Sequence, residues 1–305
     1  MIRTSRLRVV IGCALPMLLT MAATPRMARA QLRPLEPLDW RWMDQPAAAY
    51  ASVGASVLDD QRASLLGAEG RLNEIGSFTL AVRVSSVVLE FGGTPVLRFD
   101  PDRVFAGPTG GADAPDGSTV NTAGQFRAAT VVPLMRNPEE RAFAMALRFG
   151  TQLPTTDNRA GLERDRLDFF ATVSSRWRPG WHTGQAGAPR VALSAELGVG
   201  INGTRDDVRE QSDVLEYALR ARGGLGRVGS VPLEGTLTWL GQADGRIGKT
   251  PIRGNERLSE LRLGVRGGDA RWVEVEGVAG VKEFSPDWGV RLTVGMAWRR
   301  VREAH

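Results

Sequence analysis

Charged side chains recur at every second position of otherwise apolar stretches, and this spacing places them together on one face of a strand. If the strands close into a barrel, that face lines the lumen. Arginines outnumber carboxylates, so an open lumen would favour anions, whereas paired charges would fill a narrow lumen and hold it rigid. The residues expected to line the lumen are Arg83, Arg148, Asp168, Arg176, Arg190, Glu196, Glu216, Arg220, Arg222, Glu234, Arg262, Arg266, Glu274, Glu276 and Arg291.

Motifs for catalysis and metal binding are sparse. The sequence has no Gly-x-Ser-x-Gly elbow, no His-Glu-x-x-His and no phosphate-binding glycine loop. Its only cysteine is Cys13, and its only histidines are His182 and His305. We place His182 in a periplasmic turn, away from any membrane-embedded serine. The sequence therefore predicts no enzymatic activity, no cofactor and no metal site.

The charges must be positioned by β-strands in which apolar residues strictly alternate with polar or small ones. In residues 288–299, apolar side chains at even positions alternate with Gly, Arg, Thr or Ala at odd positions. A β-sandwich also alternates, but strands of nine or more residues are long for a sandwich and suit a tilted crossing of a membrane. Tryptophans near the strand ends are expected to form interfacial girdles: Trp177, Trp239, Trp272, Trp288 and Trp298.

The fold class predicted is all-β, an antiparallel transmembrane β-barrel of about twelve strands, with ten to fourteen left open. Long polar connections near 100–123, 151–164, 203–212 and 242–256 alternate with short ones near 92–94, 224–228 and 267–271, as outer loops alternate with periplasmic turns. The expected strands are 65–73, 77–91, 94–99, 124–132, 141–150, 165–178, 190–202, 213–223, 229–241, 257–266, 271–283 and 287–299.

The first thirty residues differ from the rest in composition. Three arginines precede an apolar run, and Ala28-Arg29-Ala30 precedes Gln31, which is the pattern of a secretory signal peptide cleaved after Ala30. The predicted organisation is a signal peptide at 1–30, a periplasmic lead-in with one possible extra strand at 31–64, and an outer-membrane barrel at 65–305. Whether 31–64 adds a strand, plugs the lumen or stays loose is open.

The net charge of +5 does not indicate nucleic-acid binding. The basic residues are scattered over single strand positions, without the clustered stripe that such binding needs. Export also separates the chain from its cell's nucleic acid. The expected partners are outer-membrane lipid or lipopolysaccharide, the barrel-assembly machinery and small solutes.

One local stretch resembles a known family. Residues 147–155 read Leu-Arg-Phe-Gly-Thr-Gln-Leu-Pro-Thr, followed by Gly161-Leu162 and by a strand opening at Asp165. This resembles the outer-membrane barrels of the phenol meta-pathway "transporter" group, whose members show a Lys-Leu-Pro-Thr-like phrase followed by a Gly-Leu-Gly loop. Here Gln152 replaces the lysine and Glu163 replaces the second glycine. The resemblance covers about twenty-five residues and implies a barrel that passes small, often hydrophobic compounds.

Three functional hypotheses follow. The first is a passive outer-membrane channel or transporter for small molecules, and the second is a non-conducting barrel with a structural or surface role. A secreted soluble β-sandwich is the third and least favoured. Neither the solute nor the oligomeric state follows from the sequence.

Overall fold

The computed structural model describes residues 33–44, 47–63, 66, 68–104, 118–135, 141–156, 162, 167–179, 191–202, 212–244, 258–282 and 284–299. The predicted signal peptide, Arg190, His182 and His305 lie outside the described residues. No helix among the described residues is long and apolar enough to cross a membrane.

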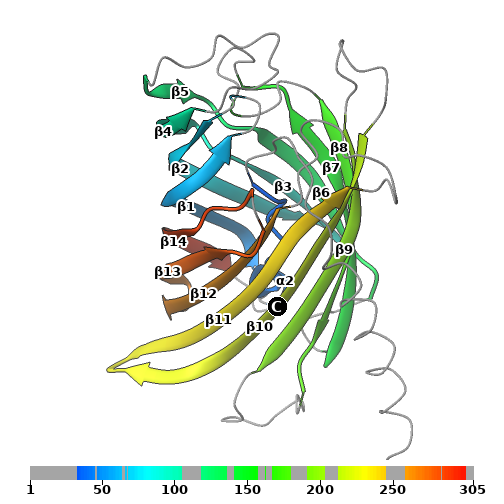
Figure 1. Ribbon diagram of the computed structural model, residues 1–305. Helices are drawn as coiled ribbons and strands as arrows, with labels where there is room; N and C mark the ends of the chain where they lie inside the picture. Colours follow the sequence, from blue (N-terminus) through cyan, green and yellow to red (C-terminus); the bar gives the residue numbers. More distant parts are fainter. Residues whose placement is uncertain are drawn as a thin grey trace, which may run out of the picture.

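The described strands form one antiparallel meander that closes on itself (Figure 1). The first barrel strand, β1, pairs with β2 on one side and with β14 on the other, so no edge is left open there. The strands are β1 Ala47–Ala63, β2 Ala68–Val84, β3 Val87–Gly93, β4 Val96–Val104, β5 Val120–Thr122, β6 Phe126–Pro133, β7 Phe143–Leu153, β8 Asp168–Trp177, β9 Ala192–Asn202, β10 Ser212–Val228, β11 Val231–Asp244, β12 Ser259–Gly268, β13 Arg271–Gly280 and β14 Trp288–Arg299.

These segments make a closed barrel of twelve strands, which confirms the predicted fold class. One half of β2 pairs with β3 and the other half with β4, so β3 and β4 are one barrel strand interrupted at residues 94–95. In the same way β5 pairs with β4 and β6 pairs with β3, so β5 and β6 together form the next barrel strand. A hydrogen bond from the Gly124 amide to the Thr94 carbonyl joins the two interrupted strands. The β-sandwich hypothesis is wrong.

The predicted boundaries near the N-terminal end of the barrel are wrong, although the strand count is right. Residues 47–63 form β1, and 68–84 form a single strand where two had been expected. At Gly76, whose φ is +76°, an extra residue shifts the register between β1 and β2. Buried positions are Leu72 and Glu74 before this bulge and Ala81 after it, so the alternation changes phase within one strand.

Two predicted turns are also misplaced. The expected turn at 92–94 is the interruption between β3 and β4, and the real reversal is at Ser85 and Ser86, with Ser85 at a φ of 57°. A serine pair lacks the glycine that normally marks a two-residue hairpin turn. The expected turn at 224–228 belongs to β10, which reverses at residues 229–230.

Inside the barrel lies a segment that belongs to no strand. We call residues 33–44 the inserted segment; it ends in the single-turn helix α2, Trp40–Asp44, which Figure 1 shows within the ring of strands. Its apolar side chains pack against inward-facing residues of the wall. The resulting buried cluster contains Leu38, Trp40, Trp42, Met43, Tyr50, Ala81, Val88, Val131, Ala144, Ala146 and Trp272.

Candidate functional site: the filled lumen

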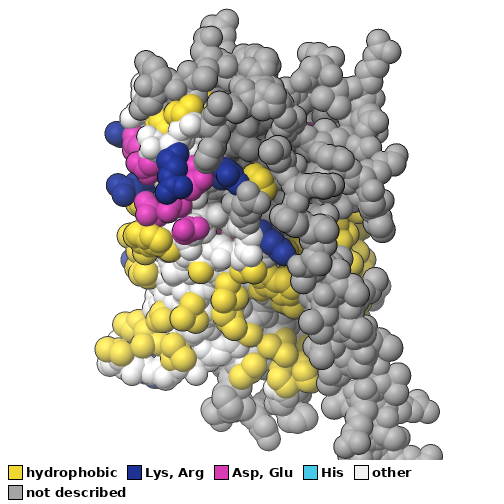
Figure 2. All heavy atoms as spheres, viewed as in Figure 1, with side chains coloured by type: hydrophobic (Ala, Val, Ile, Leu, Met, Phe, Trp, Pro, Cys, Tyr) yellow, Lys and Arg dark blue, Asp and Glu magenta, His cyan; other side chains and the backbone are white. Residues whose placement is uncertain are grey.

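The strands have an inverted polarity, with apolar side chains outside and charged side chains inside. Along β13, Val273 and Val275 are 49% and 50% exposed, whereas the alternating Glu274 and Glu276 are 7% and 9% exposed. The space-filling view shows apolar side chains over much of the visible exterior (Figure 2). A soluble barrel would lose stability by exposing so much apolar surface, so this surface is made for lipid.

Charged side chains on the exterior gather at one end of the visible face, beyond the apolar surface (Figure 2). There, Arg71 pairs with Asp59 at 3.3 Å and Arg98 with Asp100 at 3.3 Å, and both arginines are about half exposed. They lie where β1, β2 and β4 reach past the apolar belt. This end therefore faces water or lipid headgroups.

The tryptophans fit the girdle prediction only in part. Trp177, Trp288 and Trp298 are about half exposed and lie at the ends of their strands. Trp272 instead points inward and is 4% exposed; its ring stacks with Tyr50 and lies 4.0 Å from the Arg266 guanidinium carbon. Its placement in a girdle is wrong because it belongs to the packing inside the lumen.

The local sequence of the inserted segment explains its shape. Pro34 and Pro37 restrict the chain before them to extended conformations. Asp39 then accepts a hydrogen bond from the Arg41 amide at 2.9 Å, which caps the first turn of α2. The segment thus enters the lumen extended and ends as a helical turn.

Glu36 is the first charged contact between the segment and the wall. Its carboxylate accepts hydrogen bonds from Arg262 Nη1 at 2.9 Å to both oxygens and from Arg291 Nη1 at 2.8 Å. Arg148 Nη1 donates to the Glu36 backbone carbonyl at 2.8 Å. Three wall arginines from β7, β12 and β14 therefore hold this one residue.

Arg41 forms the second contact, with the charges reversed. Its two terminal nitrogens donate to the two oxygens of Glu274 at 2.8 and 2.9 Å, a bidentate pair. Arg41 Nε lies 3.0 Å from Glu234 Oε1. Since the Arg41 side chain is only 7% exposed, these wall carboxylates supply the compensation that a buried guanidinium requires.

Asp44 forms the third contact, at the end of α2. Its oxygens lie 2.9 Å from Arg176 Nη2 and 3.0 Å from Arg222 Nη2. Between the charged contacts, the Trp40 indole donates to Ser174 Oγ at 2.8 Å and the Leu38 amide donates to Glu196 at 2.6 Å. The inserted segment is thus bound along its length, with negative, positive and negative side chains each facing opposite charge.

The wall also carries ion pairs of its own. Arg148 donates to Glu90 at 2.6 Å and lies 3.6 Å from Glu196, which accepts from the Thr172 hydroxyl at 2.6 Å. Arg127 shares Glu90 at 3.3 Å. These charges are buried and mutually compensated, as in a ladder that stiffens the barrel.

The structure places the predicted lumen residues on the inner face. Arg148, Asp168, Arg176, Glu196, Glu216, Arg222, Arg262, Arg266, Glu274 and Glu276 are buried. Arg83, Arg220, Glu234 and Arg291 are partly buried and alternate with outward apolar side chains; Arg190 lies outside the described residues. The prediction missed the charges of the inserted segment and the wall residues Glu74, Glu90, Arg127 and Glu260. One signal was available, because Glu36, Asp39, Arg41 and Asp44 place charges of both signs between apolar residues in a stretch without strand periodicity.

An apolar cluster lies at the end of the lumen toward the long connections. Leu162, from the connection between β7 and β8, is fully buried against inward side chains of the wall. Its neighbours in the cluster are Leu58, Ala63, Leu66, Ala68, Leu72, Leu97, Phe99 and Val278. The lumen is therefore filled both by the inserted segment and by this cluster.

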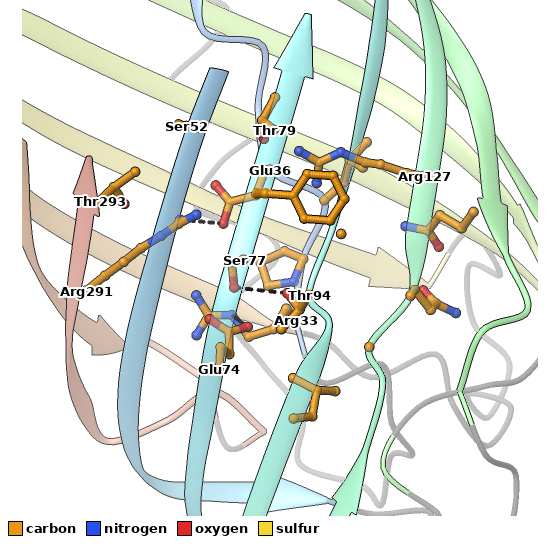
Figure 3. Close-up of a pocket in the computed structure, with 18 residues that line it drawn as sticks. Arg33, Glu36, Ser52, Glu74, Ser77, Thr79, Thr94, Arg127, Arg291 and Thr293 are labelled. Atoms are coloured by element: carbon orange, nitrogen blue, oxygen red, sulfur yellow. Dashed lines mark hydrogen bonds and ion pairs between the residues drawn. The ribbon is translucent and has the colours of Figure 1, made fainter. Parts of the chain in front are cut away.

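Two cavities remain beside the inserted segment, of about 100 and 90 Å³. Both lie against the wall formed by β14, β1, β2 and β6, and the smaller one also reaches β13 and Arg220 on β10. Figure 3 shows the larger one with Arg33, Arg127 and Arg291 around it. The residues shared by both linings are Glu36, Ser52, Thr79, Arg127, Arg291 and Thr293. The cavities thus adjoin one another along a polar strip rich in hydroxyl groups.

A closed barrel with a lipid-facing apolar belt and a charged, filled lumen defines a class: a transmembrane β-barrel of the outer-membrane type. No protein-family model matches the chain, and no curated protein matches it. Similar solved structures include the COG4313 outer membrane channel from Pseudomonas putida F1, with 12% identity, a TM-score of 0.49, and coverage of 90% of this chain and 100% of that one. The NanC porin has 6% identity, a TM-score of 0.45, and coverage of 82% and 99%.

The prediction of no enzymatic activity is corrected by these comparisons. They include LpxR from Salmonella typhimurium, an outer-membrane enzyme, with 10% identity, a TM-score of 0.42, and coverage of 80% of this chain and 99% of that one. Missing sequence motifs do not by themselves exclude catalysis, so the prediction of no enzymatic activity does not stand.

Proposed function

We propose that the protein is an outer-membrane channel for small solutes and that the inserted segment, which fills the lumen, closes it. The observation that carries the proposal is the pair of adjoining polar cavities beside the segment. A lumen built only for rigidity gains nothing from open space, because voids cost packing energy. The path would run along the hydroxyl-rich wall of β14, β1 and β2.

The contacts between the inserted segment and the barrel wall also support the proposal that the segment can leave the lumen. Besides its apolar packing, the segment is held by charged contacts of Glu36, Arg41 and Asp44 with the wall. These polar contacts can be exchanged for water when the lumen hydrates. Export by the signal peptide at 1–30, assembly by the barrel-assembly machinery and contact with lipopolysaccharide are parts of the same proposal. Membership of the phenol meta-pathway group stays a prediction that rests on the match around residues 147–170.

A non-conducting structural barrel is the second candidate. The buried ladder of Glu90, Arg148 and Glu196 favours it, since paired charges stiffen a lumen without opening it. The two candidates make opposite predictions for ionic current.

Planar-bilayer recording separates them. The intact protein should give rare or small openings, and a variant with Glu36→Gln, Arg41→Gln and Asp44→Asn should give a steady, larger current because the segment loses its charged contacts. The matched control is Arg71→Gln with Arg98→Gln, which removes exposed exterior charges and should leave the current unchanged. If the folded undocking variant stays silent, the channel proposal fails and the structural barrel stands.

A further inference from the structure

The site that holds Glu36 has the construction of a carboxylate-binding site. Arg262 and Arg291 come from β12 and β14 and converge on one carboxylate with contacts of 2.8 to 2.9 Å. Arg262 is 1% exposed, so it donates from a position shielded from bulk water. Convergent guanidinium groups of this kind are the usual protein receptor for a carboxylate.

The two arginines are not fully neutralised by the wall. Arg262 has a second carboxylate in Glu260 at 2.9 Å, but the nearest wall carboxylate to Arg291 is Glu276, at 3.9 Å. Without Glu36, therefore, Arg291 would retain only a long ion pair. An uncompensated, largely buried guanidinium attracts another anion strongly.

The space next to this site is suited to the remainder of a small ligand. Glu36 and Arg291 line both cavities, so a solute in either one meets the arginine pair directly. The hydroxyl groups of Ser52, Thr79 and Thr293 line the same two cavities, and no hydrogen bond among the described residues uses them. They are available to a ligand that carries hydroxyl groups of its own.

Arg33 offers further hydrogen-bond donors to a ligand in the larger cavity. The Arg33 side chain is 10% exposed and lies 3.3 Å from Glu260 and 3.7 Å from Glu74. Within the described part of the chain, however, none of its three guanidinium nitrogens has a hydrogen-bond partner. Figure 3 shows Arg33 beside the cavity, across from Arg127. Oxygen atoms of a bound anion would satisfy such donors.

We propose that Arg262 and Arg291 form a binding site for a small hydroxylated carboxylate, and that Glu36 occupies this site as an internal competitor. The proposal rests on the proposed function, because an external solute reaches the site only if the lumen admits it. It also assigns the solute class and a release mechanism: a carboxylate that displaces Glu36 removes one of the three charged contacts of the inserted segment.

Isothermal titration of the purified full chain with lactate tests the site without measuring current. In the unaltered protein Glu36 occupies the site in most molecules and competes with lactate. Removing this competitor with Glu36→Gln should therefore tighten lactate binding by about tenfold or more. The matched control is Asp100→Asn, which removes an exterior carboxylate paired with Arg98 and should bind lactate like the unaltered protein. Adding Arg262→Gln and Arg291→Gln to Glu36→Gln should abolish binding, acetate should bind more weakly than lactate, and glycerol should not bind.

Heat-modifiable gel migration of each variant confirms that the barrel is folded before titration. Equal lactate affinity in the unaltered protein and the Glu36→Gln variant, or binding that survives loss of both arginines, overturns the site. If lactate fails to bind while the undocking variant conducts, the inference fails and the channel stands. If lactate binds while that variant is silent, the channel fails and the carboxylate site stands.

Discussion

The wall from β8 to β13 and the wall formed by β14, β1, β2 and β6 face the same inserted segment, but they meet it with different chemistry. The first, which we call the charged sector, holds the segment through residues such as Arg176, Arg262 and Glu274. The second, the hydroxyl sector, presents Ser52, Thr79 and Thr293 and leaves the two cavities. Arg291 on β14 stands at the boundary and serves both.

In the proposed channel, therefore, the charged sector attaches the inserted segment and the hydroxyl sector leaves space for a solute. Charged pairs fix the segment in one position because removing either partner strands a buried charge. Hydroxyl groups can both donate and accept hydrogen bonds, and the short side chains of Ser and Thr leave space in the lumen. The proposed channel would need both properties to close reversibly, and the two sectors supply them from opposite sides of one lumen.

The largest expected effect comes from breaking the charged sector at Arg41. Arg41→Gln leaves the buried Glu274 without its bidentate guanidinium partner, and stranding a buried charge costs about 3 to 5 kcal/mol. Urea unfolding followed by gel mobility should show that loss. Adding Glu274→Gln should recover part of it, and losses that simply add in the double variant would show that the two residues do not act together.

A medium effect is expected from the neutral contact in the same sector. Ser174→Ala removes the acceptor of the Trp40 indole N–H, which should cost about 1 kcal/mol of unfolding free energy. Trp40→Phe removes the donor and also part of a buried ring system, so it should cost more, and the double variant should cost about 1 kcal/mol less than the sum of the two single losses. Independent, additive losses would contradict the hydrogen bond.

The smallest effect is expected in the hydroxyl sector. Ser52→Ala combined with Thr293→Val removes hydroxyls that bond to no described residue, so the unfolding free energy should change by less than about 0.5 kcal/mol. Lactate affinity of the Glu36→Gln background should nevertheless fall. A stability loss as large as that of Trp40→Phe would erase the contrast between the sectors.

The sequence was sufficient for the barrel and for the inward face of most strands, because period-two alternation fixes which side chains share a face. It was insufficient where the period is interrupted. Gly76 changes the phase inside β2, and Ser85 reverses the chain without a glycine, so one strand was divided and a turn was missed. The alternation of β1 was too weak to be assigned as a strand.

The inserted segment lay beyond such reasoning for a different reason. Its position depends on contacts far apart in the chain, such as Glu36 with Arg262 and Arg291, and no local period encodes them. The charges of both signs in residues 36–44 are compatible with a polar partner but do not identify it. The arginines were therefore predicted as a lumen lining, while the carboxylates that neutralise them were not.

Thiol labelling at Met43 tests the central account most directly. Met43 lies in α2, is fully buried and forms no ion pair. For this experiment Cys13, the only cysteine of the sequence, would be replaced by serine. In the folded protein Met43→Cys should react with a water-soluble maleimide far more slowly than in urea, and adding Arg176→Gln and Arg222→Gln should accelerate the reaction. A thiol that reacts in the folded barrel as fast as in urea would show that the segment does not fill the lumen.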